Sequence, residues 1–208
     1  MEHGERLVHI ERGLTQALNI LTGFLRQPET CGVIAKAAAV ITDCFRRGGR
    51  VLSCGNGGSM CDAMHFAEEL SGRFRDDRRA LSAIAIGDSS HLTCVANDYG
   101  FEAIFSRGVE AHGRPGDVLL AISTSGRSPN IIAAVNAARA AGMVSIALTG
   151  RINSKLASLA DIDICAVGDP NSSVPQPTER TQELHIKIIH LLIEMVERDM
   201  FPENYTGL

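Results

Sequence analysis

The 208-residue chain contains no tryptophan, and aromatic residues make up only 4% of it. Glycine and alanine fill the space instead, and their small side chains suit close packing of helices on a sheet. No apolar run approaches the 18 residues or so that a membrane span needs, so we expect no transmembrane helix. The first residues, Met1–Arg6, show no basic region followed by an apolar one, so we expect no signal peptide.

The chain also lacks a basic field. Lysine and arginine total 20 residues against 24 aspartates and glutamates, which gives a net charge of −4. A protein of this charge has little attraction for phosphate backbones or anionic lipid surfaces. We therefore expect neither a nucleic acid nor a membrane as a partner.

Paired cysteine motifs are missing as well. None of the six cysteines forms a C-x-x-C pair, and most lie in apolar segments, where a free thiol behaves as a small hydrophobic group. This usage is typical of a reducing compartment, so we expect a cytoplasmic protein. The cysteines are Cys31, Cys44, Cys54, Cys61, Cys94 and Cys165.

The composition is otherwise that of a soluble folded protein. Hydrophobic residues make up 45% and charged residues 21% of the chain. A chain of this length buries roughly 70% of its unfolded surface, so its core needs no disulfide or structural metal. The length predicts one large domain, or one domain with an added arm.

The N-terminal part reads as two helices. Leucines and isoleucines recur at intervals of three and four between Leu7 and Leu25, and Pro28 ends this pattern. A second helix is predicted over Glu29–Phe45 and ends before the glycine pair at 48–49. We expect residues 1–48 to form a helical arm of the same domain that takes part in an oligomer interface, and residues 49–208 to form the main domain.

From residue 50 onward, short apolar runs alternate with longer amphipathic ones. This rhythm predicts an α/β fold, a three-layer α/β/α sandwich with a parallel sheet. The predicted strands are Arg50–Cys54, Ala80–Ile86, Asp117–Ile122, Met143–Leu148 and Ile162–Val167. The predicted helices are Ser59–Phe74, Ser89–Asn97, Phe101–His112, Pro129–Ala141, Asn153–Leu159 and Glu179–Asp199. The proline-rich stretch Gly168–Thr178 is predicted to be a loop.

The first strand leads into a glycine-rich loop, Cys54-Gly55-Asn56-Gly57-Gly58-Ser59. Glycine lets the backbone approach a ligand closely, and the helix start that follows offers free N–H groups to an anion. The same residues also fit a tight strand-to-helix turn with Ser59 as N-cap. A dinucleotide fingerprint is excluded because Met60 stands where its last glycine is needed, and the G-K-[ST] of a Walker A motif is missing.

A second loop, Ser123-Thr124-Ser125-Gly126-Arg127-Ser128, follows the third predicted strand. Hydroxyls and backbone N–H groups at a helix N-terminus make a phosphate cradle. An N-cap alone needs one hydroxyl, so four within six residues favour a phosphate site. Arg127 could add charge there or point to solvent.

Two predicted helices carry candidate acid–base groups. His65 shares a helix face with both Glu68 and Glu69, and spacing does not choose between the two carboxylates. On the last predicted helix, His190 shares a side with Gln182 and Glu183. Both sets also fit ordinary amphipathic helices with polar faces. The spacing is compatible with zinc, although histidine and glutamate four residues apart make only half a site.

Together these segments resemble a known family. Cys-Gly-Asn-Gly-Gly-Ser at 54–59, Asp-Ala-Met-His-Phe-Ala-Glu-Glu-Leu at 62–70, Ser-Thr-Ser-Gly-x-Ser at 123–128 and Gln-Glu-Leu-His-Ile-Lys-Ile-Ile-His at 182–190 resemble the phosphoheptose isomerases. These sedoheptulose 7-phosphate isomerases belong to the sugar isomerase (SIS) domain superfamily. Any one motif is unspecific, but four in the right order are a specific signal.

The resemblance implies a flavodoxin-like SIS domain with a five-stranded parallel sheet, and a homotetramer. It implies conversion of sedoheptulose 7-phosphate to D-glycero-D-manno-heptose 7-phosphate through an enediol, the first step of heptose biosynthesis for lipopolysaccharide core or surface glycans. By position, Glu69 would be the catalytic base and His190 its partner. The implied ligands of one zinc ion per subunit are His65, Glu69, Gln182 and His190. The implied substrate-binding residues are Asn56, Gly57, Gly58, Glu69, Asn97, Asp98, Ser123, Thr124, Ser125, Ser128 and Gln182.

The family pattern thus favours Glu69 over Glu68 and Gln182 over Glu183. The loop 168–178 is longer than is usual in the family and leads into Gln182, so the transfer at that residue is the weakest. Two alternatives stay open. One is a non-catalytic SIS protein that binds a sugar phosphate or acts as an adaptor in replication initiation. The other is an isomerase of a different sugar phosphate.

Overall fold

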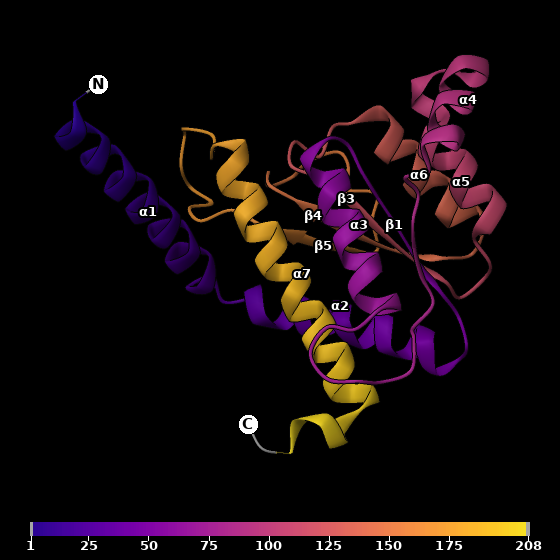
Figure 1. Ribbon diagram of the computed structural model, residues 1–208. Helices are drawn as coiled ribbons and strands as arrows, with labels where there is room; N and C mark the ends of the chain where they lie inside the picture. Colours follow the sequence, from indigo (N-terminus) through magenta and orange to yellow (C-terminus); the bar gives the residue numbers. More distant parts are fainter. Residues whose placement is uncertain (1, 207–208) are drawn as a thin grey trace.

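The computed structural model describes residues 2–206, in which a five-stranded parallel sheet lies between two layers of helices (Figure 1). The expected three-layer α/β/α sandwich is therefore confirmed. The expected arm (1–48) and main domain (49–208) each extend slightly beyond the described residues, by residue 1 and by residues 207–208. The strands are β1 Val51–Gly55, β2 Ala83–Ala85, β3 Val118–Ser123, β4 Val144–Thr149 and β5 Ile162–Cys165.

The helices follow the predicted periodicity closely. They are α1 His3–Leu25, α2 Thr30–Arg46, α3 Gly58–Ser71, α4 Ser89–Tyr99, α5 Ile104–His112, α6 Pro129–Ala140 and α7 Thr178–Met200, with short 3₁₀ helices η1 Phe101–Ala103 and η2 Pro202–Tyr205. The helix expected over Phe101–His112 is thus divided between η1 and α5. None of the helices in the described range is long and apolar enough to cross a membrane.

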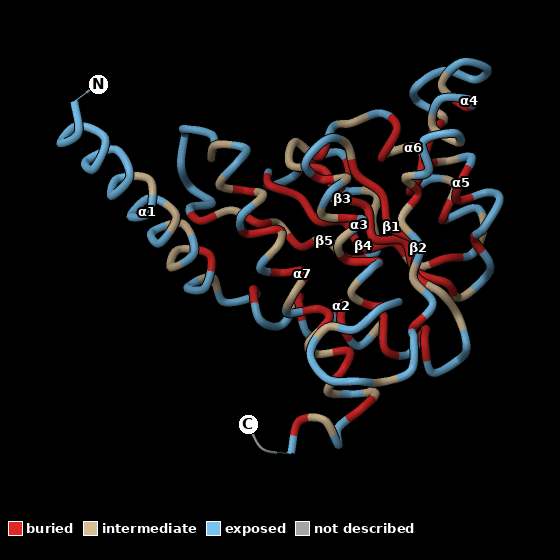
Figure 2. Tube along the Cα trace, in the orientation of Figure 1, coloured by how far each residue is buried: buried red, intermediate tan, exposed pale blue. Residues whose placement is uncertain are grey.

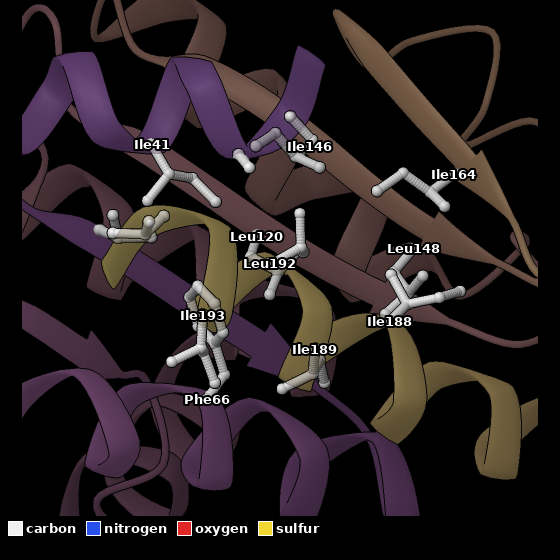
Figure 3. Close-up of a cluster of buried hydrophobic side chains, with 14 of the residues drawn as sticks. Ile41, Phe66, Leu120, Ile146, Leu148, Ile164, Ile188, Ile189, Leu192 and Ile193 are labelled. Carbon is white, nitrogen blue, oxygen red and sulfur yellow. The ribbon is translucent and has the colours of Figure 1, made fainter. Parts of the chain in front are cut away.

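Alternation along the strands divides the core in two. Leu120 and Ile122 of β3 belong to a cluster with α2, α3 and α7, whereas Leu119 and Ala121 belong to a cluster with α4, α5 and α6. Figure 3 shows the first cluster, in which Phe66 of α3 and side chains of α7 pack against one face of the sheet. The strands β1, β3 and β4 are therefore covered on both faces, as their continuous apolar runs predict, whereas the edge strand β2 leaves Ile84 exposed.

The sheet order is β2-β1-β3-β4-β5, and every neighbouring pair is parallel. After β1 the chain forms β2 at one edge of the sheet, whereas β3, β4 and β5 follow on the other side of β1. In sheets of this order, ligands bind in the crevice at the carboxyl ends of β1 and β3, where the strand order reverses. The glycine-rich loop after β1 and the serine-rich loop after β3 both lie at that crevice.

The helix expected over Asn153–Leu159 is wrong, because this segment forms a series of turns. Asn153 has a left-handed backbone with φ 54°, which interrupts a right-handed helix. The Leu156 N–H donates to the Gly126 carbonyl at 2.9 Å, which ties the segment to the serine-rich loop, while the N–H groups of Ser158 and Leu159 close only single turns onto Ser154 and Leu156. Tertiary contact overrides the local apolar pattern here.

Two expected strands are shorter in the structure. β2 covers only Ala83–Ala85 of the expected 80–86, and β5 stops at Cys165. Leu81 instead donates its N–H to the Leu70 carbonyl at 3.0 Å, at the end of α3. The loop expected over 168–178 is confirmed up to Pro177, after which α7 begins.

The two N-terminal helices differ in burial (Figure 2). α2 contributes Ile34, Ile41 and Phe45 to the core beside α7, whereas Phe24 is the only buried residue of α1 among the described residues. The N-terminal half of α1 projects away from the sheet (Figure 1).

Candidate active site

The glycine-rich loop places α3 directly behind β1. Gly57 is the residue before the helix and has φ 55°, a conformation that costs glycine little and other residues much. A side chain at Gly58 would collide with the amide Nε2 of Gln182 on α7. Ser59 is buried as the second residue of α3, so the expectation that it caps the helix is wrong. Gly57 therefore serves the turn into the helix, and Gly58 serves close approach between the loop and Gln182 of α7.

The serine-rich loop folds into a small hydroxyl cluster. Ser123 Oγ lies 3.1 Å from Ser128 Oγ and accepts a hydrogen bond of 3.2 Å from the Gly126 N–H. Ser125 Oγ accepts from the Arg127 N–H at 3.3 Å, while the Arg127 side chain is exposed. Ser128 is the N-cap position of α6, yet its side chain makes no capping hydrogen bond. A simple cap therefore does not explain the hydroxyls.

Asn130 links the two loops and was not singled out by the sequence reasoning. Its side chain is 2% exposed and exchanges two hydrogen bonds of 2.8 Å with the side chain of Asn56. Its Oδ1 also accepts from the Ile131 N–H at 3.0 Å. The sequence did contain a signal for this role: Asn130 is an amide at a helix start, directly after Pro129 and the hydroxyl motif. Asn56, which the resemblance places on the substrate, is held in position by this pair.

His65, Glu69 and His190 converge where α3 meets α7. His65 Nε2 lies 3.0 Å from His190 Nε2 and 3.5 Å from Glu69 Oε1. One donor atom from each of the three side chains lies within 4.8 Å of the others. We call these three residues the His–Glu–His cluster. Residues 125 positions apart in the chain meet here because both helices cover the same face of the sheet.

The structure distinguishes the two glutamates that spacing left open. Glu68 contacts the other ring nitrogen of His65, with 3.5 Å between its Oε1 and Nδ1, and its side chain is 64% exposed. The Glu69 side chain is 17% exposed and faces the cluster. Burial raises the pKa of Glu69, and the charge of Glu68 raises it further.

His190 is also perturbed by its surroundings. Burial lowers its pKa, and the neighbouring His65 and Lys187 lower it further. Its ring packs at 5.7 Å from the ring of Phe74. A neutral imidazole is therefore favoured at this position, which is the form that can both accept and donate a proton.

Gln182 lies beside the glycine-rich loop, next to Gly58, whereas Glu183 is exposed and pairs with Arg180 at 2.5 Å. The preceding loop is tied to α7 by Gln176, whose Nε2 donates to the Thr181 hydroxyl at 3.0 Å. The longer loop thus leaves Gln182 next to Gly58, and its role as a zinc ligand stays a prediction.

Asn97 and Asp98 lie on α4, on the other side of the sheet from the cluster. Both are exposed, and Asn97 Nδ2 donates to Asp98 Oδ1 at 2.8 Å. Among residues 2–206, their side-chain hydrogen bonds join them to each other and to Cys94, and to neither loop. These bonds do not bring Asn97 or Asp98 to either loop, so their contact with substrate stays a prediction.

The His–Glu–His cluster fits a metal ion. A tetrahedral zinc ion with ligands at about 2.0–2.1 Å holds its donor atoms about 3.3 Å apart. The two distances from His65 Nε2, 3.0 Å and 3.5 Å, bracket that separation. The arrangement brings two imidazole nitrogens and a carboxylate oxygen to one point, which is the ligand chemistry that zinc prefers.

Comparison with known proteins agrees with this geometry. The sequence model of the SIS domain matches residues 15–150. The phosphoheptose isomerase of Yersinia enterocolitica is 53% identical over 193 residues, which cover 92% of this chain and 96% of the relative. The chain belongs to the phosphoheptose isomerases of the SIS domain family. The relative from Proteus mirabilis is likewise 53% identical, over 189 residues.

Solved structures of phosphoheptose isomerases share the fold. The enzyme from Neisseria gonorrhoeae superposes with a TM-score of 0.78 at 38% identity and covers 94% of this chain and 99% of its own. The enzyme from Francisella tularensis gives a TM-score of 0.80 at 34% identity, covering 95% of this chain and 100% of its own. The likeness therefore spans nearly the whole of both chains.

Proposed function

We propose that this phosphoheptose isomerase converts sedoheptulose 7-phosphate to D-glycero-D-manno-heptose 7-phosphate, the first step of heptose biosynthesis for lipopolysaccharide core or surface glycans. The protein is an aldose–ketose isomerase. The observation that carries the proposal is the convergence of His65, Glu69 and His190 where α3, the helix that follows the glycine-rich loop, meets α7. A non-catalytic SIS protein has no need of this cluster.

The reaction moves a proton between C1 and C2 through an enediol, which needs a base near both carbons. Glu69 takes this role: its raised pKa brings its proton affinity closer to neutral pH, where a general base works best. Its carboxylate removes the proton from one carbon and returns it to the other.

His190 moves protons between the oxygens O1 and O2, because its neutral ring can donate from one nitrogen and accept at the other while neither nitrogen is held by a metal ion. Ser123, Thr124, Ser125 and Ser128 hold the phosphate by their hydroxyls and backbone N–H groups. Asn56, Gly57 and Gly58 line the sugar site. Asn97 and Asp98 also contact the sugar, an assignment that rests on their positions in the family pattern.

We propose that the metal ion is zinc, one per subunit, held by His65, Glu69, Gln182 and His190. Zinc would polarise the substrate carbonyl and stabilise the enediolate. Elemental analysis of protein expressed with added zinc should give about one zinc per chain, and His65→Ala and His190→Ala should each lower it. Zinc-free protein under these conditions would remove the metal from the proposal and leave the acid–base roles standing.

We further propose a homotetramer in which residues 1–48 form the arm and interface and residues 49–208 the SIS domain. The exposed leucines of α1 support this proposal, since a large apolar patch on a protein surface usually marks a partner surface. We place the enzyme in the cytoplasm, where its six thiols, each free in the structure, stay reduced.

One assay tests the proposed reaction. The purified protein is incubated in deuterated water with sedoheptulose 7-phosphate, ribulose 5-phosphate or fructose 6-phosphate. We expect turnover of the first substrate only, with solvent deuterium at the carbon that receives the proton. Turnover of another sugar phosphate would identify a different isomerase, and tight binding without any turnover would identify a binding protein.

A further inference from the structure

A buried ion pair lies at the C-terminal ends of α3 and α7, the two helices that carry the His–Glu–His cluster. Arg78, in the segment after α3, is 1% exposed at its side chain, and Glu197 of α7 is 2% exposed. The Arg78 Nε donates to Glu197 Oε1 at 2.8 Å. Burying two charges is costly unless their remaining polar atoms are also satisfied, so the other contacts of this pair decide its role.

The rest of the guanidinium group caps α3. Its Nη2 donates to the carbonyl of Glu69 at 2.7 Å, and its Nη1 donates to the carbonyls of Leu70 at 2.9 Å and Gly72 at 2.7 Å. The last carbonyls of a helix have no partner within it, so a buried helix end needs donors of this kind. One of the capped carbonyls belongs to Glu69 itself.

The Glu197 side chain is fixed from its other side. Its Oε2 accepts from the hydroxyl of Tyr205 in η2 at 2.8 Å. Glu197 follows His190 by seven residues, or about two helical turns, so the two side chains project from one stripe of α7. The pair therefore joins the end of α3 that carries Glu69 to the stripe of α7 that carries His190, and Figure 1 shows the two helices side by side.

We propose that Arg78 and Glu197 are positioning residues that set the placement of Glu69 relative to His190. They touch neither the substrate nor the metal ligands' donor atoms; they act by fixing the backbone of one helix against the other. The inference rests on the proposed isomerase function for its kinetic consequence and on the His–Glu–His cluster for its binding consequence. A displacement of about 1 Å in a catalytic group can cost roughly 100-fold in rate.

The decisive variant is Arg78→Lys, which keeps the charge but has three donors on one nitrogen instead of a planar fork of five. The matched control is Arg75→Lys. Arg75 also joins the segment after α3 to α7, through Glu194 at 2.9 Å, but its side chain is 42% exposed and donates to no α3 carbonyl in the described range.

We expect Arg78→Lys to lower kcat by roughly 10- to 100-fold with KM for sedoheptulose 7-phosphate changed less than about threefold. Zinc affinity, measured by competition with a chelator, should fall by roughly 10-fold or more, as for other groups that support metal ligands. Arg75→Lys should keep both values within about twofold of wild type. Measurements are made well below the melting temperature of each variant.

An Arg78→Lys protein with a lower melting temperature but unchanged kcat and zinc affinity would overturn the proposal and leave a purely stabilising ion pair. If that variant does not fold, Glu197→Gln replaces it, since the amide keeps the shape and still accepts from Tyr205. Unchanged kcat and zinc affinity in folded Glu197→Gln would overturn the proposal equally. If wild type does not isomerise the substrate, the proposed function fails, and the zinc measurement still decides the positioning role.

Discussion

At the scale of single residues, adjacent positions on α3 have different surroundings. Glu68 and Glu69 both approach His65 to 3.5 Å, but at opposite ring nitrogens. Glu69 meets His190 of α7 in the cluster, and burial raises the pKa of Glu69. A step of one residue along α3 thus separates the proposed base, Glu69, from its exposed neighbour Glu68.

Glu69→Gln should therefore lower kcat by roughly 10²–10⁴-fold, because the amide keeps the size of the side chain and cannot accept the proton. Glu68→Gln is the control and should stay close to wild-type turnover. Steady-state kinetics with sedoheptulose 7-phosphate measure both. Near-normal turnover by Glu69→Gln together with an inactive Glu68→Gln would reverse the assignment.

His185 provides a prediction about stability and pH. It is fully buried on α7, its Nε2 lies 3.1 Å from the Thr149 carbonyl, and burial lowers its pKa to about 4. Below the unfolded pKa of about 6.5, the unfolded chain binds a proton that the folded chain does not. The free energy of unfolding should therefore fall as pH drops from about 6.5 to about 4.

At pH 5.5 this histidine should reduce the free energy of unfolding by about 1.4 kcal/mol relative to its value at neutral pH. His185→Gln keeps a donor for the Thr149 carbonyl and lacks the titration. Urea unfolding of both metal-free proteins at pH 7.5 and 5.5 isolates the contribution of His185, since other groups titrate in both. Equal pH dependence in the two proteins would show that His185 is not kept neutral by folding.

At the scale of elements, two strand-to-helix junctions build the site. The loop after β1 supplies close approach through glycine, and the loop after β3 supplies hydroxyls at the start of α6. Two hydrogen bonds between the side chains of Asn56 and Asn130 hold the two junctions together. Because β1 and β3 are neighbours in the sheet, the two junctions share one crevice.

The hydroxyl loop should bind the phosphate, so Ser123→Ala combined with Ser125→Ala should raise KM for sedoheptulose 7-phosphate at least about 10-fold. Each hydrogen bond to a charged group contributes about 1.5–3 kcal/mol. Ser106→Ala on α5, whose hydroxyl donates to the Ala103 carbonyl at 3.2 Å, is the control and should leave KM unchanged. Urea unfolding separates binding from stability: an unchanged KM in the double variant would reduce the loop to a structural turn.

At the scale of the whole molecule, α1 is the element that a single chain leaves uncovered. The side chains of Leu14 and Leu18 are 68% and 62% exposed, and a cavity of about 790 Å³ lies between α1 and the loop at Gly168. A side chain at Gly23 would collide with the Gly168 carbonyl, and one at Gly168 would collide with the Ile20 backbone. The C-terminal end of α1 is thus anchored while its leucines face outward.

We expect light scattering to find an oligomer at micromolar concentration, most simply a tetramer, and a monomer would contradict this prediction. Deleting residues 1–27 should reduce the oligomer and abolish turnover. Leu14→Gln with Leu18→Gln is a milder test, because these exposed side chains contribute little to the fold of one chain. A monomeric variant with full activity would show that the site is complete within one chain.

Much of this molecule follows from local sequence. The two helices before residue 48, the strands with continuous apolar runs and the loops at 54–59 and 123–128 are properties of short segments, because periodicity and glycine act within a few residues. The error at Asn153–Leu159 has the same origin. That segment has an apolar pattern of its own, but its conformation depends on a hydrogen bond with Gly126, which is distant in the chain and does not show in the local pattern.

The sequence by itself determined the layered fold, the glycine-rich and serine-rich loops and, through the four motifs, the family. The family pattern also favoured Glu69 over Glu68, which spacing left open. Only the tertiary structure decided that Asn130 braces Asn56 and that Arg78 caps the end of α3. The reason is physical. Hydrogen bonds and charge pairs between α3, α6 and α7 depend on how the helices dock on the sheet, and helix docking is fixed by packing over the whole core rather than by spacing along the chain.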